Sequence, residues 1–318
     1  MVRAVAATAY GGTEVIDLID VESRAPEPDE VTIAVRAAAL NRWDAKQAAG
    51  AAGTDPAKLP VRLGSEAAGV VTAAGADAVS LEGETLAVGD EVYGHKLRGA
   101  QADELTVKAG LVVRKPPAKS FVEASGLLSN GTTAVHALET VGIAAGDIVL
   151  VHSASGGVGW LVSQLARLRG ARVIGTASER NHDQLRSLGV EPVTYGDGLA
   201  ERVRVLAPDG IDAAIDTVGT DEAVEVSLAL LGDPARLVTI ANAQFATVVD
   251  AGGHAIGGGA GADPGTAIRD AARLTLAKLF ADGAIGVDVA QTYPLDDART
   301  AYDHLVTGHA GGKVVLEP

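Results

Sequence analysis

A turn of small residues between two apolar segments is the strongest chemical signature in the chain. It reads Ser153-Ala154-Ser155-Gly156-Gly157-Val158-Gly159 and directly follows the apolar residues 148–151. Apolar residues then recur at helical spacing as far as Leu168, and a second β-branched run occupies residues 172–174. A strand, a tight turn, a helix and a strand in this order predict a dinucleotide-binding βαβ unit.

The residue types in this turn suit a pyrophosphate. Gly156 lets the backbone approach the phosphates, and Gly159 lets the helix pack closely on the first strand. The free N–H groups and the positive dipole end of the helix would face the same phosphates. The strict pattern has glycine where this chain has Ala154, so an ordinary strand-to-helix turn without a ligand is the alternative. The candidate cofactor-binding residues are Ser155, Gly156, Gly157, Val158 and Gly159.

The residues after the second strand bear on the choice of cofactor. NAD enzymes usually carry an acid at the end of this strand, which binds the ribose 2′-hydroxyl. Here that position is Ala177, followed by Ser178 and Arg180, which offer a hydroxyl and a guanidinium to a 2′-phosphate. We therefore expect NADPH rather than NADH. In the alternative, Arg180 is only a solvated first-turn residue and Glu179 turns inward.

Composition narrows the class of protein. The 318 residues suggest two domains, and the net charge of -15 argues against nucleic acid and anionic membranes as partners. The chain has no cysteine, which excludes disulfides, a thiolate nucleophile and cysteine-bound zinc. The N-terminus reads as an alternating strand, and no apolar run is long enough to span a bilayer. We expect a cytoplasmic protein.

The periodicity changes along the chain. Residues 1–118 read as short strands and turns, which predicts an antiparallel barrel or sandwich interrupted by one helix over residues 43–49. From residue 148 strands and helices alternate, which predicts a parallel, doubly wound sheet. The candidate strands are 2–8, 31–37, 69–72, 91–93 and 105–107, then 148–151, 172–174, 193–195, 211–215, 237–240 and 313–316.

Two stretches are harder to interpret. Residues 121–141 are helical in pattern, and we expect an interruption at 131–133. Residues 251–265 are too rich in glycine for a regular element, so we expect a loop, either a flap beside the cofactor or a disordered connector. The last strand is expected to return to the first domain.

Seven short motifs occur in the order typical of one family. They are Pro28-Asp29-Glu30-Val31, Ala39-Leu40-Asn41-Arg42-Trp43-Asp44, Leu63 to Val71, Gly89 to Tyr93, Gly131 to Ala134, the Gly156 turn and Gly312 to Leu316. With these motifs the chain resembles the zinc-free medium-chain dehydrogenase/reductases of the quinone oxidoreductase-like (zeta-crystallin-type) family over nearly its whole length.

The resemblance implies an α/β protein of two domains. A GroES-like β-barrel domain would comprise residues 1–118 and 266–318, and a Rossmann doubly wound parallel-sheet domain residues 119–265. It also implies a cofactor in the cleft between the domains, and a homodimer.

The resemblance also implies further site residues. The catalytic candidates are Asn41, Lys46 and Thr133. Asn41 and Thr133 are also candidates for cofactor binding, together with Tyr195, Ala241 and Asn242. Lys46 departs from the family pattern, which often has tyrosine there, so it is either a cationic donor or a surface lysine. We interpret His152, in the strand before the turn, as a packed core histidine rather than a catalytic one.

Zinc can be weighed against the same motifs. Zinc-dependent relatives have cysteine at the position of Asn41 and histidine at that of Ser65, and only Glu66 matches them. An amide, a hydroxyl and one carboxylate are poor zinc ligands. We therefore expect no metal.

The activity implied is transfer of a hydride from NADPH to a quinone or a related enone. Two alternatives stay open: an enoyl or 2-alkenal double-bond reductase, and a protein that binds NADPH without turnover.

Overall fold

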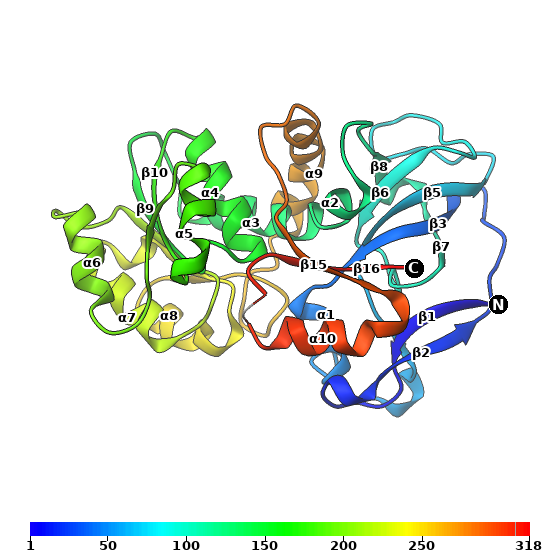
Figure 1. Ribbon diagram of the computed structural model, residues 1–318, viewed down its shortest axis with the longest axis horizontal. Helices are drawn as coiled ribbons and strands as arrows, with labels where there is room; N and C mark the ends of the chain where they lie inside the picture. The colour runs from blue at the N-terminus through cyan, green and yellow to red at the C-terminus, as the bar shows by residue number, and fades with distance from the viewer. Residues whose placement is uncertain (309) are drawn as a thin grey trace. The chain divides into compact units, whose positions relative to one another are not determined.

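The chain folds into two compact units. The structure is a computed structural model that describes residues 1–308 and 310–318. Unit 1 comprises Met1–Ser129 and Leu274–Pro318, and unit 2 comprises Asn130–Arg273. The boundaries fall inside two helices, α3 (Leu128–Thr140) and α9 (Thr266–Ala281) (Figure 1). The expected domain limits, 118/119 and 265/266, stay a prediction.

Unit 1 is built mainly of antiparallel strands. One sheet has the order β15-β16-β3-β5-β6-β8, with β7 also paired to β3, and a smaller sheet has the order β2-β1-β4. The strands are β1 (Val2–Ala7), β2 (Ile16–Val21), β3 (Glu30–Ala39), β4 (Val61–Arg62), β5 (Glu66–Ala74), β6 (Glu91–His95), β7 (Glu104–Lys108), β8 (Val112–Arg114), β15 (Val289–Pro294) and β16 (Lys313–Glu317). The helices are α1 (Arg42–Ala48), α2 (Phe121–Ser125) and α10 (Ala298–Val306).

The C-terminal strand completes unit 1, as expected. β16 pairs antiparallel with β3, with Val315 opposite Ala39, and parallel with β15. Its apolar residues Val314 and Leu316 are fully buried in a core with Leu40 and Tyr302. The first and last segments of the chain therefore share one core.

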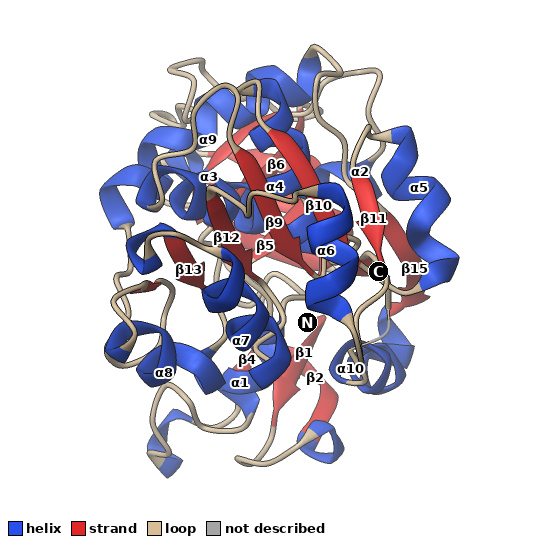
Figure 2. Cartoon of the chain, turned by 90° about the vertical axis from the view of Figure 1, so that its left-hand side faces the viewer, coloured by secondary structure: helices blue, strands red, loops and turns tan. Residues whose placement is uncertain are grey.

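Unit 2 is a parallel sheet with the strand order β11-β10-β9-β12-β13-β14, which confirms the doubly wound prediction (Figure 2). Leu150, Ile174, Ala214 and Leu237 lie on the face covered by α6, α7 and α8, while α4 packs on β9 and β10. The strands are β9 (Ile148–His152), β10 (Arg172–Thr176), β11 (Glu191–Val193), β12 (Ala213–Asp216), β13 (Leu237–Thr239) and β14 (His254–Ala255). The helices are α4 (Gly157–Leu168), α5 (His182–Ser187), α6 (Leu199–Leu206), α7 (Asp221–Leu230) and α8 (Phe245–Asp250).

The expected interruption at residues 131–133 is wrong. The chain breaks earlier, between α2, which Ser120 caps, and α3, which runs through Gly131 to Thr133 without a break. Gly131 and Thr132 are buried, and tertiary packing commonly overrides weak helix propensity in this way.

The glycine-rich stretch 251–265 contains a strand, contrary to expectation. β14 pairs parallel with β13, with Ala255 opposite Thr239, and forms the edge of the sheet. Ile256 is buried beside it and extends the apolar contact. Two apolar residues, Ala255 and Ile256, are enough to form this short strand because β13 supplies the backbone groups that pair with it. The local sequence does not show that such a partner is present.

No helix among the described residues is long and apolar enough to cross a membrane.

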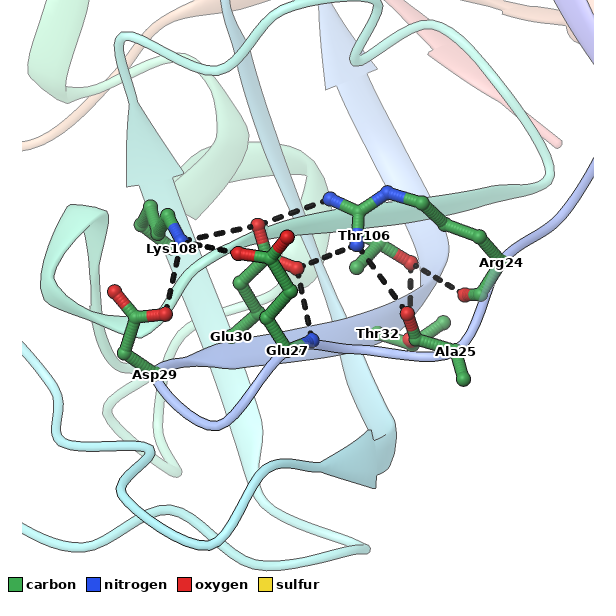
Figure 3. A network of polar contacts seen from close by, with 8 residues as sticks. All are labelled: Arg24, Ala25, Glu27, Asp29, Glu30, Thr32, Thr106 and Lys108. Carbon is green, nitrogen blue, oxygen red and sulfur yellow. Dashed lines mark hydrogen bonds and ion pairs between the residues drawn. The ribbon is translucent and has the colours of Figure 1, made fainter.

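A polar network connects the segment before β3 to the strands β3 and β7 (Figure 3). The buried carboxylate of Glu30 accepts hydrogen bonds from the Arg24 guanidinium, at 2.5 and 2.9 Å, and from the backbone N–H of Glu27. Lys108 lies 3.5 Å from the same carboxylate and also binds Glu27 and Asp29. The hydrogen bonds from Arg24, followed by that from Glu27, lower the pKa of Glu30 to about 2.

We expect Glu30→Gln to lower the free energy of unfolding by about 1–3 kcal/mol at pH 7, because Arg24 loses a charged acceptor. The folded pKa lies below the ordinary value of 4.5. The stabilisation is therefore complete above pH 4.5 and is lost as the pH falls toward 2. Urea unfolding at pH 7 and at pH 3.5 measures the difference between wild type and variant. An equal difference at the two pH values would contradict the assignment.

Candidate functional site

The turn after β9 has a strained and well-supported backbone. Ser153 has a positive φ of 57°, which is uncommon for a residue other than glycine. Its N–H donates to the Thr176 hydroxyl at 3.0 Å, and the N–H of Ala154 donates to the Thr176 carbonyl at 2.9 Å. The end of β10 therefore fixes the turn that begins at the end of β9.

Glycine is required where α4 meets this turn. A Cβ on Gly159 would lie 2.2 Å from the Ser153 carbonyl oxygen, so only glycine permits this approach. Ala154 fits in place of the usual glycine because Gly175, on β10, has no side chain: a Cβ there would lie 2.6 Å from that of Ala154. The departure from the strict pattern is thus compensated within the unit.

The start of α4 has the geometry of an anion site. Gly156 caps the helix in an extended conformation, and Gly157 is its first residue. The N–H groups of the first turn have no acceptor within the helix, and a twelve-residue helix adds its dipole to them. The strand order reverses between β9 and β12, and ligands bind at the strand ends beside such a reversal. The five predicted residues of the turn are therefore grouped where a pyrophosphate fits.

The loop after β12 is fixed by the buried Asp216. One carboxylate oxygen accepts from the N–H groups of Val218 and Gly219, at 2.9 and 2.8 Å, and the other accepts from the Thr239 hydroxyl at 2.7 Å. Thr217 donates its hydroxyl to the carbonyl of His152 at 2.7 Å. These bonds tie the ends of β9, β12 and β13 together beside the turn.

The segment after β10 begins with an alanine where NAD enzymes usually have an acid, and polar residues follow it. Ala177 is buried, Ser178 is half-buried, and Arg180 is exposed in the short helix η4 (Glu179–Asn181). The Asn181 amide donates to the hydroxyl of Ser155 at 2.9 Å and to that of Ser178 at 3.4 Å. It thereby links the turn at residues 153–159, called here the phosphate turn because a pyrophosphate is expected there, to the predicted ribose site. Asn181 was not among the predicted site residues, although it directly follows Arg180 in the sequence.

Tyr195 lies two residues beyond β11, and 49% of its surface is exposed. Arg202 of α6 fixes the turn around it by donating to the carbonyl oxygens of Thr194, Gly196 and Asp197 at 2.8 Å. The third strand ends at Val193, two residues earlier than the strand predicted at 193–195. Tyr195 is therefore a turn residue whose ring is available at the surface of unit 2.

Ala241, Asn242 and Thr133 are also in unit 2. Ala241 caps η6 (Asn242–Gln244) directly after β13, and its N–H donates to the Thr239 hydroxyl at 3.1 Å. A Cβ on Gly219 would lie 2.4 Å from that of Ala241, so the loops after β12 and β13 are in close contact. Thr133 is half-buried on α3.

His152 is a packed core histidine, as expected. It is buried, its Nε2 lies 2.9 Å from the Ser227 hydroxyl, and burial lowers its pKa to about 4.

Asn41 and Lys46 both belong to unit 1, Asn41 as the N-cap of α1 and Lys46 in its last turn. Asn41 caps the helix, its own N–H bonding the Asp44 carboxylate at 2.9 Å. Lys46 lies in the last turn and is half-buried; burial lowers its pKa, and the nearby charge of Arg42 lowers it further. A lowered pKa makes an ammonium a better proton donor near neutral pH.

A buried ammonium lies against the cap of α1. Lys313 Nζ donates to Glu66 Oε1 at 2.8 Å, Asn41 Oδ1 at 2.9 Å and the Leu40 carbonyl at 3.1 Å. The Asn41 amide nitrogen donates to Glu66 Oε1 at 3.0 Å and lies 3.5 Å from the Ser65 hydroxyl. Asn41, Ser65 and Glu66 were singled out from the sequence, whereas Lys313 was quoted only within the motif Gly312 to Leu316 and was assigned no role.

A second buried carboxylate lies beside this group. Asp44 accepts from the N–H of Asn41 and from the Gln101 amide, while its Oδ1 has no hydrogen bond among the described residues. Burial raises its pKa to about 7, against the opposing effects of the Asn41 N–H and the Lys313 charge. The N-cap of α1 is thus surrounded by three buried ionisable side chains, those of Asp44, Glu66 and Lys313.

Fold and site together define a class: a GroES-like domain joined to a Rossmann-type domain with a dinucleotide-binding turn. A family model for the alcohol dehydrogenase GroES-like domain matches residues 27–117, and one described as zinc-binding dehydrogenase matches residues 188–316. The chain belongs to the medium-chain dehydrogenase/reductase family, in its quinone oxidoreductase-like branch.

Similar proteins include enzymes of more than one kind. The chain is 32% identical to the NADPH-dependent alkenal/one oxidoreductase of Arabidopsis thaliana over 97% of its length and 78% of the relative's. It is 30% identical to a mycocerosic acid synthase-like polyketide synthase of Mycolicibacterium smegmatis, and spans only 15% of that protein.

The solved structures that match almost the whole chain include two enzymes of different kinds. Escherichia coli quinone oxidoreductase complexed with NADPH has a TM-score of 0.83 at 26% identity, covering 99% of this chain and 100% of that one. The CurK enoyl reductase has a TM-score of 0.85 at 25% identity, covering 99% of both chains.

We expect Gly159→Ala to lower the free energy of unfolding of unit 2 by about 1–3 kcal/mol, because the added methyl group meets a backbone oxygen that cannot yield without moving α4. Denaturant unfolding followed by circular dichroism measures this. Gly232→Ala is the matched control, since no atom lies within 4 Å of its added Cβ. Equal effects of the two substitutions would show that the approach of α4 is not constrained as described.

Proposed function

We propose that the protein is an NADPH-dependent oxidoreductase that transfers a hydride to a quinone or a related enone without a metal ion. The observation that carries the proposal is the phosphate turn at α4, linked through Asn181 to a ribose site without a carboxylate at Ala177. The NADPH dependence of the Arabidopsis relative and the NADPH complex of the E. coli enzyme support this choice.

The cofactor is held by residues of unit 2. The first-turn N–H groups of α4 bind the pyrophosphate. Ser178 and Arg180 bind the 2′-phosphate through a hydroxyl and a guanidinium, while Asn181 holds Ser178 in place. Tyr195 covers the adenosine end. Ala241, Asn242 and Thr133 are proposed to contact the nicotinamide end.

Bound NADPH supplies a hydride, and the chain must then stabilise negative charge on the acceptor oxygen. The Asn41 amide has two N–H groups, of which Glu66 takes one at 3.0 Å. The second, which only approaches Ser65 at 3.5 Å, is the proposed donor to the acceptor oxygen or the cofactor. Lys46 is the proposed proton source, because burial lowers the pKa of its ammonium.

The absence of a metal is proposed from the chemistry of the side chains. The sequence has no cysteine, and no group of three or more metal-binding side chains occurs among the described residues. Asn41 and Glu66, at the positions of zinc ligands in relatives, are engaged by the Lys313 ammonium. A cation in that place repels a second one.

Reduction of a carbon–carbon double bond is the second candidate, because the CurK enoyl reductase matches this chain as well as the quinone oxidoreductases do. Both reactions deliver a hydride to a conjugated acceptor. The homodimer implied by the resemblance stays a prediction.

The proposal is tested by following NADPH oxidation with a benzoquinone, a naphthoquinone, an alkenal and a crotonyl thioester, with NADH in parallel. We expect turnover with the quinones and a preference for NADPH, in protein without stoichiometric zinc. Turnover with only the alkenal or thioester identifies a double-bond reductase. If no acceptor is reduced although NADPH still binds, the catalytic proposal is refuted and the protein is one that binds NADPH without turnover.

We expect Arg180→Ala to weaken NADPH binding about tenfold, which is about 1.4 kcal/mol, and to leave NADH binding nearly unchanged. The reason is that only NADPH carries the 2′-phosphate. Quenching or enhancement of nicotinamide fluorescence on titration gives both dissociation constants. Arg186→Ala is the control, because this exposed arginine pairs with Asp183 on α5. A parallel loss of NADH and NADPH affinity would refute the 2′-phosphate role.

A further inference from the structure

The most tightly enclosed charge pair described in unit 1 is not used by the proposed reaction. The Lys313 and Glu66 side chains are 4% and 1% exposed, and their charged atoms are 2.8 Å apart. The three protons of the ammonium match three acceptors, at Leu40, Asn41 and Glu66. A buried ammonium has no water to turn toward, so these three distances fix its position.

The ammonium decides how Asn41 is oriented. The amide oxygen of Asn41 accepts from Lys313, so its nitrogen must face Glu66 and Ser65. Rotation of the amide by 180° would direct an N–H group at the ammonium, which is repulsive. The N–H group proposed to face the acceptor is therefore oriented by a side chain on another element, β16.

Glu66 extends the same constraint to α3. Its second oxygen accepts the N–H of Ser129, in the first turn of that helix, at 2.9 Å. Ser129 is the second residue of α3, so this hydrogen bond fixes where the helix begins. Gly126 makes room for the stem of Lys313: a Cβ there would lie 3.2 Å from two of its carbons.

We propose that Lys313 is a positioning residue that holds the start of α1, and with it Asn41 and Lys46, in a fixed place beside Ser129 at the start of α3, through one buried ammonium. The inference rests on the proposed oxidoreductase function. It assigns to Lys313 and Glu66 no contact with substrate or cofactor. Their contribution is the fixed placement of two helix starts, which lowers the cost of orienting the reacting groups.

The test separates charge compensation from positioning. Lys313→Met leaves Glu66 buried without its partner, and we expect a large loss of thermal stability. The double variant Lys313→Met/Glu66→Gln removes both charges and should recover most of that stability. We nevertheless expect its kcat to stay at least tenfold below wild type. The dissociation constant for NADPH should change less than threefold, because most of its proposed contacts, those to the phosphates at α4 and η4, are in unit 2. Lys278→Met/Asp282→Asn, an exposed pair on α9, is the matched control.

A readout independent of turnover uses Trp43, the second residue of α1. The chain has two tryptophans, Trp43 and Trp160. In variants that also carry Trp160→Phe, all tryptophan fluorescence comes from Trp43. We expect the double variant to shift Trp43 emission and to increase its quenching by acrylamide. Wild-type kcat and unchanged Trp43 emission in a folded double variant would overturn the inference.

Two further outcomes are distinguishable. If the double variant does not fold, Lys313→Arg keeps the charge but moves the donor atoms. A folded arginine variant with kcat lowered at least tenfold supports positioning, and one with wild-type kcat overturns it. If the wild-type protein fails to oxidise NADPH with any of the acceptors tested, the proposed function fails. The Trp43 measurement then still tests the placement of α1.

Discussion

The close approach of α4 to the turn after β9 is the constraint on which unit 2 depends. Because Gly159 has no side chain, the helix starts directly against the Ser153 carbonyl, and its N–H groups and dipole are aimed at the carboxyl ends of the strands. The hydroxyl of Thr176 and the carboxylate of Asp216 hold the adjoining strand ends in register with this start. The anion site is thus a property of the packed backbone, and few charged side chains are needed for it.

Unit 1 depends on a different kind of interaction. Its N-terminal strands are closed by β16, and that strand carries Lys313 into a position where three oxygen atoms surround the ammonium. Charge pairs inside a protein seldom add stability over well-packed apolar side chains. Here the hydrogen bonds of the pair fix the orientation of the Asn41 amide. The cap of α1 is therefore held by hydrogen bonds between charged and polar side chains inside a largely aliphatic core.

Much of the fold was predictable because it follows from local periodicity. The strand at 148–151, the helix after it and the alternation of strands and helices in unit 2 match the structure closely, whereas the strands β2, β4, β8, β14 and β15 were not predicted. The errors arose where pairing partners outside the local sequence decide the outcome. β14 is a strand only because β13 offers an edge, and α3 continues through Gly131 because its surroundings bury that residue. The site residues were predicted as separate motifs; their hydrogen-bond partners Asn181 and Lys313 were not.

The sequence by itself determined the dinucleotide-binding turn, the parallel alternation of unit 2 and the family, because each of these is written in residues close to one another along the chain. Only the tertiary structure decided how Asn41 is oriented and how a carboxylate is buried beside it. Lys313 is 272 positions from Asn41 in the chain and 2.9 Å from it in space. A contact of that sequence separation depends on how β16 pairs with β3, and no spacing rule within the sequence contains that information.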